Sequence, residues 1–482
     1  MAGYFPIEIL EALRVRGKKP ALVVGTGVLS GEMVRGAVLG VARQLRQRGV
    51  GPGSRVVVVS NNGPRGLVLA LAIAALGGVV VPWSPILPAG EIGVTHLFHI
   101  GPLPQGLHFP QAEAMADDWM RGEAADPAGL PGYASENDIC FVTSSSGTTG
   151  QPKFLDRPVA LVGSKMAGGT QLGGRTLAML HETLSYPGFM AALIVLRHGV
   201  LCLPQSGQSG PDEVLRMGAT RIDLVFGSPA QVAAWLGPEP LKRKLLAIWT
   251  SGAPMTPALV RRFRKQASFI ASVYGSTEGA INARAMIVAP LPGRSRLRYT
   301  PDRDCEIQVV DEADRLVPRG TEGEIRGRSR FMSTGYIGST GDADGTYRDG
   351  WFYPGDRGIL HRDGSLEVVG RSRDTLNLGG VKLNAGLIDA AAAEVAGVET
   401  AMCFECESPT GETRLGLVVV TRAGADRRKV AEALHQNLLP VVRTRYALPT
   451  IGFIDQLPLG PAGKPLRAAG EALLGRAELA QI

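Results

Sequence analysis

Cysteine is scarce in this 482-residue sequence. The chain contains only five cysteines, a count that is both low and uneven, so they cannot all form pairs. Such a count excludes a disulfide-stapled scaffold and favours a reducing compartment. Cys403 and Cys406 form a Cys-x-x-Cys pair, but the sequence has no second pair to complete a zinc site. The apolar stretch around them favours structural thiols. His96 and His99 also lack further ligands, so we interpret them as structural residues.

Long apolar runs are missing as well. The most apolar segment, Gly66–Val81, is shorter than the roughly 20 residues that a spanning helix needs, and Pro82 closes it. We expect a buried helix followed by a buried strand there. The stretch Met1–Pro20 has no continuous apolar core of the kind found in signal peptides. We therefore predict a cytoplasmic protein without a transmembrane segment.

Strong charge of one sign is absent too. Charged residues make up 20% of the chain and hydrophobic residues 45%, the profile of an ordinary globular protein. The formal net charge is +7, but the basic residues are scattered and show no pattern typical of nucleic-acid binding. This charge suits a polyanionic ligand such as ATP or coenzyme A, or an acidic partner, although a general contribution to solubility explains it equally well.

The apolar pattern alternates between helical and strand periods along most of the chain. Short β-branched runs such as Arg55–Ser60 and Val200–Leu203 are separated by helical stretches, which predicts a large layered α/β domain. From Cys305 onward, short strands with Gly and Asp turns predict a small antiparallel, β-barrel-like unit that closes this domain. A chain of this length is too long for a single hydrophobic core and is expected to form at least two domains. We predict an N-terminal domain over residues 1–372 and a small, mobile α+β C-terminal domain over residues 373–482.

A hydroxyl-rich and glycine-bearing segment, Thr143–Lys153, directly follows a predicted strand. Its glycines allow the backbone to turn and point N–H groups at an anion, while the hydroxyls add donors and the lysine adds positive charge. The glycine spacing is too short for a Walker A loop. A polar surface loop is the alternative. We favour a phosphate-binding loop made of Thr143, Ser144, Ser145, Ser146, Gly147, Thr148, Thr149, Gly150 and Lys153.

This segment resembles the phosphate loop of the adenylate-forming superfamily, which includes acyl- and aryl-CoA synthetases, peptide-synthetase adenylation domains and luciferases. Further motifs similar to that family follow in the same order: an adenine and magnesium motif at Tyr274–Glu278, a ribose motif at Trp351–Asp356, an interdomain hinge at Gly370–Asp374 and a lysine loop at Pro458–Arg467. The matches cover essentially the whole chain. The resemblance therefore implies an AMP-binding enzyme with a large domain and a mobile smaller one.

The resemblance also implies roles for single residues. Lys464 would be the catalytic lysine, delivered to the carboxylate and α-phosphate, and Thr277 would contact that phosphate. Glu278 and Thr148 would hold magnesium, a metal that favours carboxylate and phosphate oxygens. Asp356 accepts hydrogen bonds only, which suits the ribose hydroxyls. The other residues assigned to ATP or AMP are Gly252, Ala253, Pro254, Tyr274, Gly275, Ser276 and Arg371. The alternatives are a surface residue in a turn for Glu278, an exposed charge for Lys464, a plain turn for Gly355–Asp356 and structural ion pairing for Arg371, and in the family context we favour the functional roles.

The segment His181–Gly188 lies where the family places a histidine or aromatic gate over the acid, and it resembles the aryl-acid-activating members. A structural histidine is the alternative for His181. We predict an acid pocket lined by His181, Gly252, Tyr274 and Gly275.

The family pattern makes Arg373 the hinge and places Gly379 and Gly380 at a thiol channel. The sequence departs from the family at Arg373, where Asp or Lys is more usual, and at Asp389, where many members carry Glu. We predict ATP-dependent activation of a carboxylic acid as an acyl-AMP, with Mg²⁺ and pyrophosphate release, then transfer to the pantetheine thiol of coenzyme A or a carrier protein. An amine acceptor and a catalytically silent nucleotide-binding relative are the alternatives.

Overall fold

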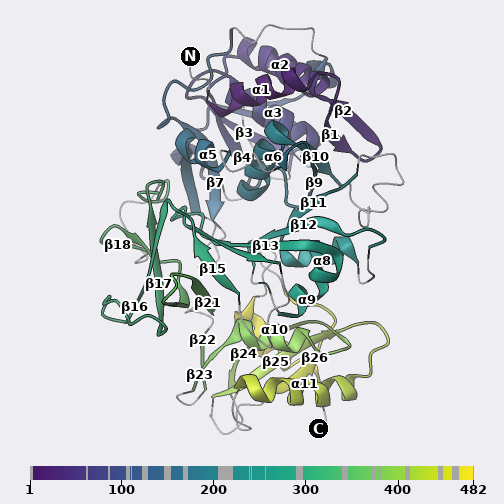
Figure 1. The fold of residues 1–482 in the computed structure, drawn as a ribbon, viewed down its shortest axis with the longest axis vertical. Helices are drawn as coiled ribbons and strands as arrows, with labels where there is room; N and C mark the ends of the chain where they lie inside the picture. Colours follow the sequence, from purple (N-terminus) through teal and green to yellow (C-terminus); the bar gives the residue numbers. More distant parts are fainter. Residues whose placement is uncertain are drawn as a thin grey trace.

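The computed structural model describes residues 4–60, 63–84, 87–104, 109, 111–121, 129–145, 153–166, 172–204, 221–237, 239, 241–253, 255, 257–288, 297–338, 346–371, 375–378, 381–407, 413–442, 449–458 and 466–480. A large, sheet-rich N-terminal part is followed by a smaller C-terminal part, with the two chain ends at opposite ends of the long axis (Figure 1). The predicted mixed α/β fold is confirmed. No helix within the described residues is long and apolar enough to span a membrane.

One sheet near the N-terminus has the strand order β6-β5-β3-β4-β7-β8 and is parallel except for the antiparallel pair of β7 and β8. Its strands are β3 Arg55–Ser60, β4 Val79–Pro82, β5 His96–Ile100, β6 Ala112–Ala114, β7 Ile139–Ser145 and β8 Lys153–Pro158. The helices of this region are α1 Phe5–Arg16, α2 Gly31–Gln47, α3 Gly63–Ala75, α4 Ala89–Ile92 and α5 Val159–Met166, with a 3₁₀ turn, η1, at Asp117–Met120.

The apolar segment that the sequence assigns to a buried helix and strand forms α3 and β4. Every residue of α3 from Gly66 to Ala75 is buried. A helix that is apolar on all sides needs cover on all sides, and α3 receives it from α2 and β3. This prediction is confirmed.

The central sheet runs in the order β2-β1-β10-β9-β11-β12-β13-β14 and then continues into the antiparallel strands described below. The chain β10-β9-β11-β12-β13 is parallel, so these strands end at the same edge. Its strands are β1 Pro20–Val24, β2 Gly27–Ser30, β9 Thr176–Met179, β10 Val200–Leu203, β11 Leu224–Gly227, β12 Leu245–Ser251, β13 Ala267–Gly275 and β14 Asn282–Ile287. The helices between them are α6 Tyr186–His198, α8 Pro229–Leu236 and α9 Pro257–Gln266.

The strands after β14 pair antiparallel, as the turn-rich sequence predicts. They are β15 Arg298–Pro301, β16 Cys305–Val310, β17 Glu322–Ser329, β18 Tyr347–Arg348, β19 Trp351–Phe352, β20 Asp356–Leu360 and β21 Leu366–Arg371. The pair of β14 and β15 joins them to the central sheet, so this unit is an extension of that sheet.

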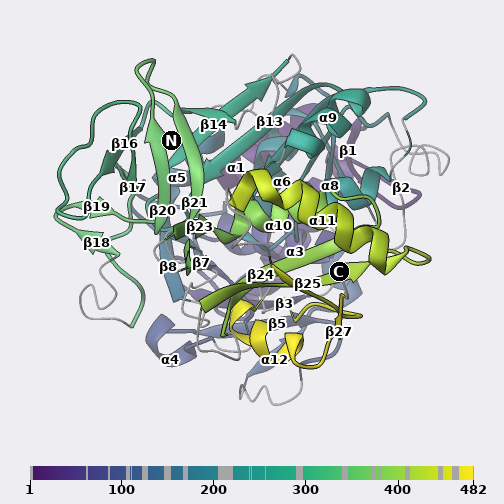
Figure 2. The ribbon, with the colours of Figure 1, turned by 90° about the horizontal axis from the view of Figure 1, so that it is seen from below.

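The C-terminal part has a hairpin and a sheet in the order β24-β25-β26-β27. Alternate strand residues face opposite sides: Cys403 and Leu417 pack with α10 and α11, whereas Phe404 and Val418 pack with α12. In Figure 2, α10 and α11 lie on one side of β24 and β25, and α12 lies on the other. The elements are β22 Thr375–Leu378, β23 Val381–Asn384, α10 Ala385–Ala393, β24 Val398–Glu407, β25 Thr413–Thr421, α11 Arg427–Val442, β26 Thr450–Phe453, a 3₁₀ turn η6 at Arg467–Ala469, α12 Gly470–Leu474 and β27 Glu478–Leu479. The boundary between residues 372 and 373 lies outside the described residues, so its position and the mobility of this part stay predictions.

Candidate active site

The predicted phosphate loop connects β7 and β8. These strands pair antiparallel, and Ser145 at the end of β7 lies opposite Lys153 at the start of β8. The two strand ends that the loop joins are therefore neighbours in the sheet. Thr143 is buried and Ser144 is exposed. The residues between the strands, which include Ser146, Gly147, Thr148, Thr149 and Gly150, lie outside the described residues. The phosphate-binding role of the loop therefore stays a prediction.

Tyr274 and Asp356 come from different predicted motifs and are in direct contact. Tyr274 lies near the end of β13, and its hydroxyl donates a 2.7 Å hydrogen bond to Oδ2 of Asp356 at the start of β20. Asp356 is only 9% exposed. In the pairing of β20 with β21, Asp356 stands opposite Arg371. The fold therefore brings the predicted adenine, ribose and hinge-side segments together.

The turn that follows Tyr274 and Gly275 carries Ser276, Thr277 and Glu278, and its backbone is held firmly. Every backbone carbonyl from Thr277 to Asn282 accepts a hydrogen bond. The donors, in order along the turn, are Arg157 Nη2 at 2.6 Å, Ser333 N at 3.1 Å, Ser329 Oγ at 2.9 Å, Cys305 Sγ at 3.7 Å, Ser276 N at 3.2 Å and Asp302 N at 2.9 Å. Most of these donors come from distant segments. Ala280 adopts a positive φ of 48°, a conformation that such bonds stabilise.

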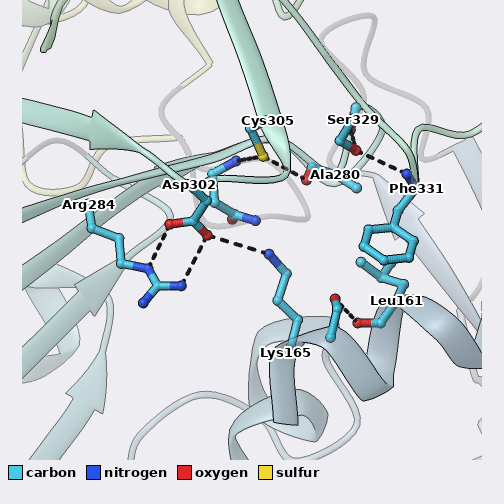
Figure 3. Close-up of polar contacts among 11 residues, drawn as sticks. Leu161, Lys165, Ala280, Arg284, Asp302, Cys305, Ser329 and Phe331 are labelled. Atoms are coloured by element: carbon cyan, nitrogen blue, oxygen red, sulfur yellow. Dashed lines mark hydrogen bonds and ion pairs between the residues drawn. The ribbon is translucent and has the colours of Figure 1, made fainter. Parts of the chain in front are cut away.

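An ion-pair cluster supports the far side of this turn (Figure 3). Asp302 accepts from Arg284 at 3.0 Å and lies 3.8 Å from Nζ of Lys165, which projects from α5. Burial lowers the pKa of Lys165, and Asp302 acts in the opposite direction. The cluster links α5, beside the phosphate-loop strands, to the antiparallel strands that follow Glu278.

Tyr336 lies between Lys153 and Glu278. Its ring centroid is 4.6 Å from Nζ of Lys153, and its hydroxyl donates to Oε1 of Glu278 at 3.5 Å. The described residues contain no group of three His, Cys, Asp or Glu side chains able to hold a metal ion. Glu278 nevertheless fits magnesium, because this metal is commonly held by one or two carboxylates together with substrate phosphates and water. Tyr336 is not predicted from the sequence, because a single tyrosine carries no motif.

The predicted acid-pocket residues lie at the edge where the parallel strands end. His181 follows β9, Gly252 follows β12, and Tyr274 and Gly275 end β13. Ligands of parallel α/β sheets bind beyond the carboxyl ends of the strands. Gly252 has a positive φ of 83° and open space where a Cβ would lie, and Ala253 beside it is exposed. Pro254 lies outside the described residues.

His181 is packed between neighbouring strands. Its Nε2 lies 3.3 Å from Oγ of Ser251, and its ring meets Phe226 edge-on with the centroids 4.8 Å apart. Burial lowers the pKa of His181 to about 4. The imidazole is therefore neutral near neutral pH and can present a hydrogen-bonding group next to an aromatic face.

The C-terminal predictions fall on positions that the structure does not describe. Lys464, the hinge residue Arg373, and Gly379 and Gly380 lie outside the described residues, as does the side chain of Arg371. Their roles stay predictions. The chain on both sides of Lys464 is described, and N of Leu466 donates to O of Pro458 at 2.9 Å.

A family model described as AMP-binding enzyme matches residues 10–337, more than half of the chain. The chain belongs to the AMP-binding enzyme family. This membership confirms the predicted resemblance to the adenylate-forming superfamily and the prediction that the chain is an enzyme.

Relatives of this AMP-binding enzyme align over most of its length. It is 28% identical to a feruloyl-CoA synthase from Amycolatopsis sp over 488 residues, which cover 92% of this chain and 93% of the relative. Its fold is similar to that of the anthranilate CoA ligase AuaEII in complex with anthranoyl-AMP, with a TM-score of 0.81, 18% identity and coverage of 98% and 99%. It is also similar to the amide bond synthetase McbA from Marinactinospora thermotolerans, with a TM-score of 0.77, 21% identity and coverage of 97% and 99%. At these identities, both structures support the fold alone.

Proposed function

We propose that this enzyme activates a carboxylic acid as an acyl-AMP and transfers the acyl group to a pantetheine thiol, that of coenzyme A or of a carrier protein. In the first half-reaction, a carboxylate oxygen attacks the α-phosphorus of ATP and pyrophosphate leaves. In the second, the thiol attacks the acyl carbon and AMP leaves. The observation that carries this proposal is the contact of Tyr274 with Asp356 at the edge where β9, β12 and β13 end.

Contacts among the described residues support the first half-reaction. Two anions must approach each other, so positive charge and hydrogen-bond donors must converge on the phosphate. Lys153 lies near Glu278 through Tyr336, and the turn at Thr277 is fixed by the bonds to its carbonyls. Asp356 would accept from a ribose hydroxyl, and Glu278 would hold magnesium, which supplies positive charge to the phosphates when it is bound. Thr148, the second predicted magnesium ligand, lies outside the described residues.

Aromatic acids are the substrates that we propose first. The ring of Phe226 packs edge-on against His181, one of the residues of the predicted acid pocket. Aromatic rings prefer such tilted contacts, so an aromatic acid can pack against this pair in the same way. The name of the feruloyl-CoA synthase, and that of the anthranilate CoA ligase bound to anthranoyl-AMP, each contain an aryl acid and support the same choice.

The test is acid-dependent exchange of labelled pyrophosphate into ATP, over a panel of aryl, short-chain, medium-chain, long-chain and amino acids. We expect exchange with at least one aryl acid. Lys464→Ala should abolish the exchange yet largely spare thioester formation from supplied acyl-adenylate. Lys429→Ala, at an exposed lysine of α11, is the matched control and should leave both half-reactions unchanged. Exchange that survives in Lys464→Ala would remove the catalytic role of Lys464.

An amine acceptor is the second candidate, favoured by the similarity in fold to the amide bond synthetase McbA. Mass spectrometry of products formed with coenzyme A, a phosphopantetheinylated carrier protein and simple amines separates the two. A thioester supports the first proposal, and an amide without thioester supports the second. ATP binding without exchange for any acid would instead favour a catalytically silent relative.

A further inference from the structure

Arg157 on β8 is a buried cation that no sequence motif contains. Its side chain is fully buried, with 0% exposure, and is the largest among the fully buried side chains of the described residues. Burial of a charge is costly unless bonds compensate for it. Burial lowers the pKa of Arg157, while Tyr186 and Glu278 act in the opposite direction. Because arginine stays protonated in proteins, a positive charge lies inside this region.

The two ends of the guanidinium are bonded to the segments that flank Glu278. Nη2 donates to O of Thr277 at 2.6 Å, and Nη1 donates to Oγ of Ser333 at 3.1 Å. Ser333 in turn donates its N–H to O of Glu278 at 3.1 Å. The planar fork of arginine thus connects the residue that precedes the predicted magnesium ligand with the residue that bonds to its carbonyl, a geometry that a lysine cannot reproduce.

The charge of Arg157 has no carboxylate partner within salt-bridge distance in the part of the chain that the structure describes, and Nε has no hydrogen-bond partner there. A buried charge without a counter-charge is costly, so the hydrogen bonds to Thr277 and Ser333 have to offset the burial of Arg157. Among the described residues, both hydrogen bonds of its guanidinium go to Thr277 and Ser333, on the side of Glu278. Its ring neighbour, Tyr186, has its centroid 5.6 Å from Cζ and covers another face.

We propose that Arg157 is a positioning residue that holds the Thr277–Glu278 turn in the geometry needed to bind MgATP, an inference that rests on the proposed function. It acts through Glu278 and does not touch the substrate. Arg157 also links the phosphate loop to the Tyr274–Glu278 motif. Its strand, β8, begins at Lys153 at the end of the phosphate loop, and its side chain bonds to Thr277.

Arg157→Lys and Arg157→Met test this inference, with Arg48→Met as the matched control. Arg48 also makes several hydrogen bonds and covers an aromatic ring, that of Trp119, but it lies at the end of α2. The Mg²⁺ concentration for half-maximal pyrophosphate exchange is measured at saturating ATP and acid, together with the melting temperature. We expect both Arg157 variants to need about tenfold more Mg²⁺, the equivalent of one lost charged hydrogen bond. The KM of the acid should stay within about twofold, because the acid pocket is built from other strands.

Arg48→Met should lower the melting temperature without a change in the Mg²⁺ requirement. Arg157 variants that fold and keep the wild-type Mg²⁺ requirement would overturn the inference. If neither Arg157 variant folds, Ser333→Ala replaces them, because it removes one of the two acceptors and leaves the charge in place. We expect it to raise the Mg²⁺ requirement about threefold, and an unchanged requirement overturns the inference.

Calorimetry separates this inference from the proposed function. ATP binding is measured with and without Mg²⁺ in wild type and in the variants, without any acid. If the wild type shows no exchange with any acid, the proposed function fails, but a Mg²⁺-dependent gain in ATP affinity that is lost in Arg157→Lys still supports the inference. A wild type in which Mg²⁺ adds nothing to ATP binding overturns it.

Discussion

The hydroxyl of Tyr274 donates a 2.7 Å hydrogen bond to Oδ2 of Asp356, which lies 82 residues later in the chain. This bond connects the end of a parallel strand with the start of an antiparallel one, and it orients a carboxylate that is almost fully buried. A carboxylate that is already oriented loses less freedom when it accepts a hydrogen bond from a ligand. The pair is therefore a preformed element of the proposed ribose site.

Tyr274→Phe removes this donor and keeps the ring. We expect the KM for ATP to rise about fivefold, the equivalent of about 1 kcal/mol for one hydrogen bond. Initial rates of pyrophosphate exchange at varied ATP measure it. Tyr133→Phe is the control, since Tyr133 is buried and its hydroxyl makes a similar 2.8 Å bond to O of Gly78, far from the motifs. A rise in the KM of the acid alone would contradict the ribose role and leave Tyr274 in the acid pocket.

Tyr336 provides a second test, because two of its groups act on different partners. Tyr336→Phe keeps the ring near Lys153 but removes the hydroxyl, and the 3.5 Å bond to Glu278 is long enough that its loss should change the KM for ATP by less than about twofold. Tyr336→Leu also removes the cation–π contact, which predicts a rise of about three- to fivefold. Steady-state kinetics of exchange decide between them. Equal effects of the two substitutions would show that the ring does not support Lys153.

Much of the fold follows from the sequence because the patterns are local. The apolar run at Gly66–Val81 is too short to span a membrane and is apolar on all sides, so it predicts a buried helix and a buried strand. The structure has α3 and β4 at these positions. The turn-rich sequence after Cys305 likewise predicts antiparallel strands. Their continuity with the central sheet does not follow, because it depends on the pairing of β14 with β15, which no sequence periodicity encodes.

The residues of the candidate site also fall into two groups, those that stand in local motifs and those brought to the site by long-range contacts. Thr277, Glu278 and Asp356 stand in motifs and were predicted, whereas Arg157 and Ser333 were not. Arg157 is 120 residues from Thr277 and 176 from Ser333. Nothing in the local sequence distinguishes a buried arginine on a strand from an exposed one, since strand alternation depends on which face the rest of the fold covers.

His181 predicts a pH dependence of stability. Burial holds its pKa at about 4 in the folded state, below the value of about 6.5 in the unfolded chain. Between these values the unfolded state binds more protons, so stability rises with pH through this window and is constant above it. From about pH 7 to about pH 5, we expect a loss of about 2 kcal/mol from this residue. The free energy of unfolding is measured by urea denaturation at both pH values. His181→Gln should not show this loss of stability, whereas the control His99→Gln, which changes a histidine near the surface, should still show it. Identical slopes for wild type and His181→Gln would exclude a neutral, buried His181.

Asp389 and Arg467 predict how the C-terminal part is held together. Asp389 accepts from the N–H of Cys403 at 2.7 Å and from Arg467 at 2.5 Å, and Arg467 also donates to O of Cys403 at 2.6 Å. Burial raises the pKa of Asp389, and the guanidinium opposes this rise. Arg467→Met leaves the carboxylate without its counter-charge, which should cost about 3 kcal/mol near pH 7. Hydrogen exchange of the β24 amides measures the loss.

The sign of the pH dependence identifies the mechanism. In Arg467→Met the folded-state pKa of Asp389 rises further above the unfolded value, so stability falls as pH rises through that window and is recovered as Asp389 takes up a proton. The loss should therefore shrink at about pH 5, and Arg467→Met combined with Asp389→Asn should be less destabilised than Arg467→Met alone. Arg427→Met breaks the exposed pair with Glu478 and should cost less than about 1 kcal/mol. If Arg467→Met costs no more than this control and shows no pH dependence, the buried pair does not stabilise the segment next to Lys464.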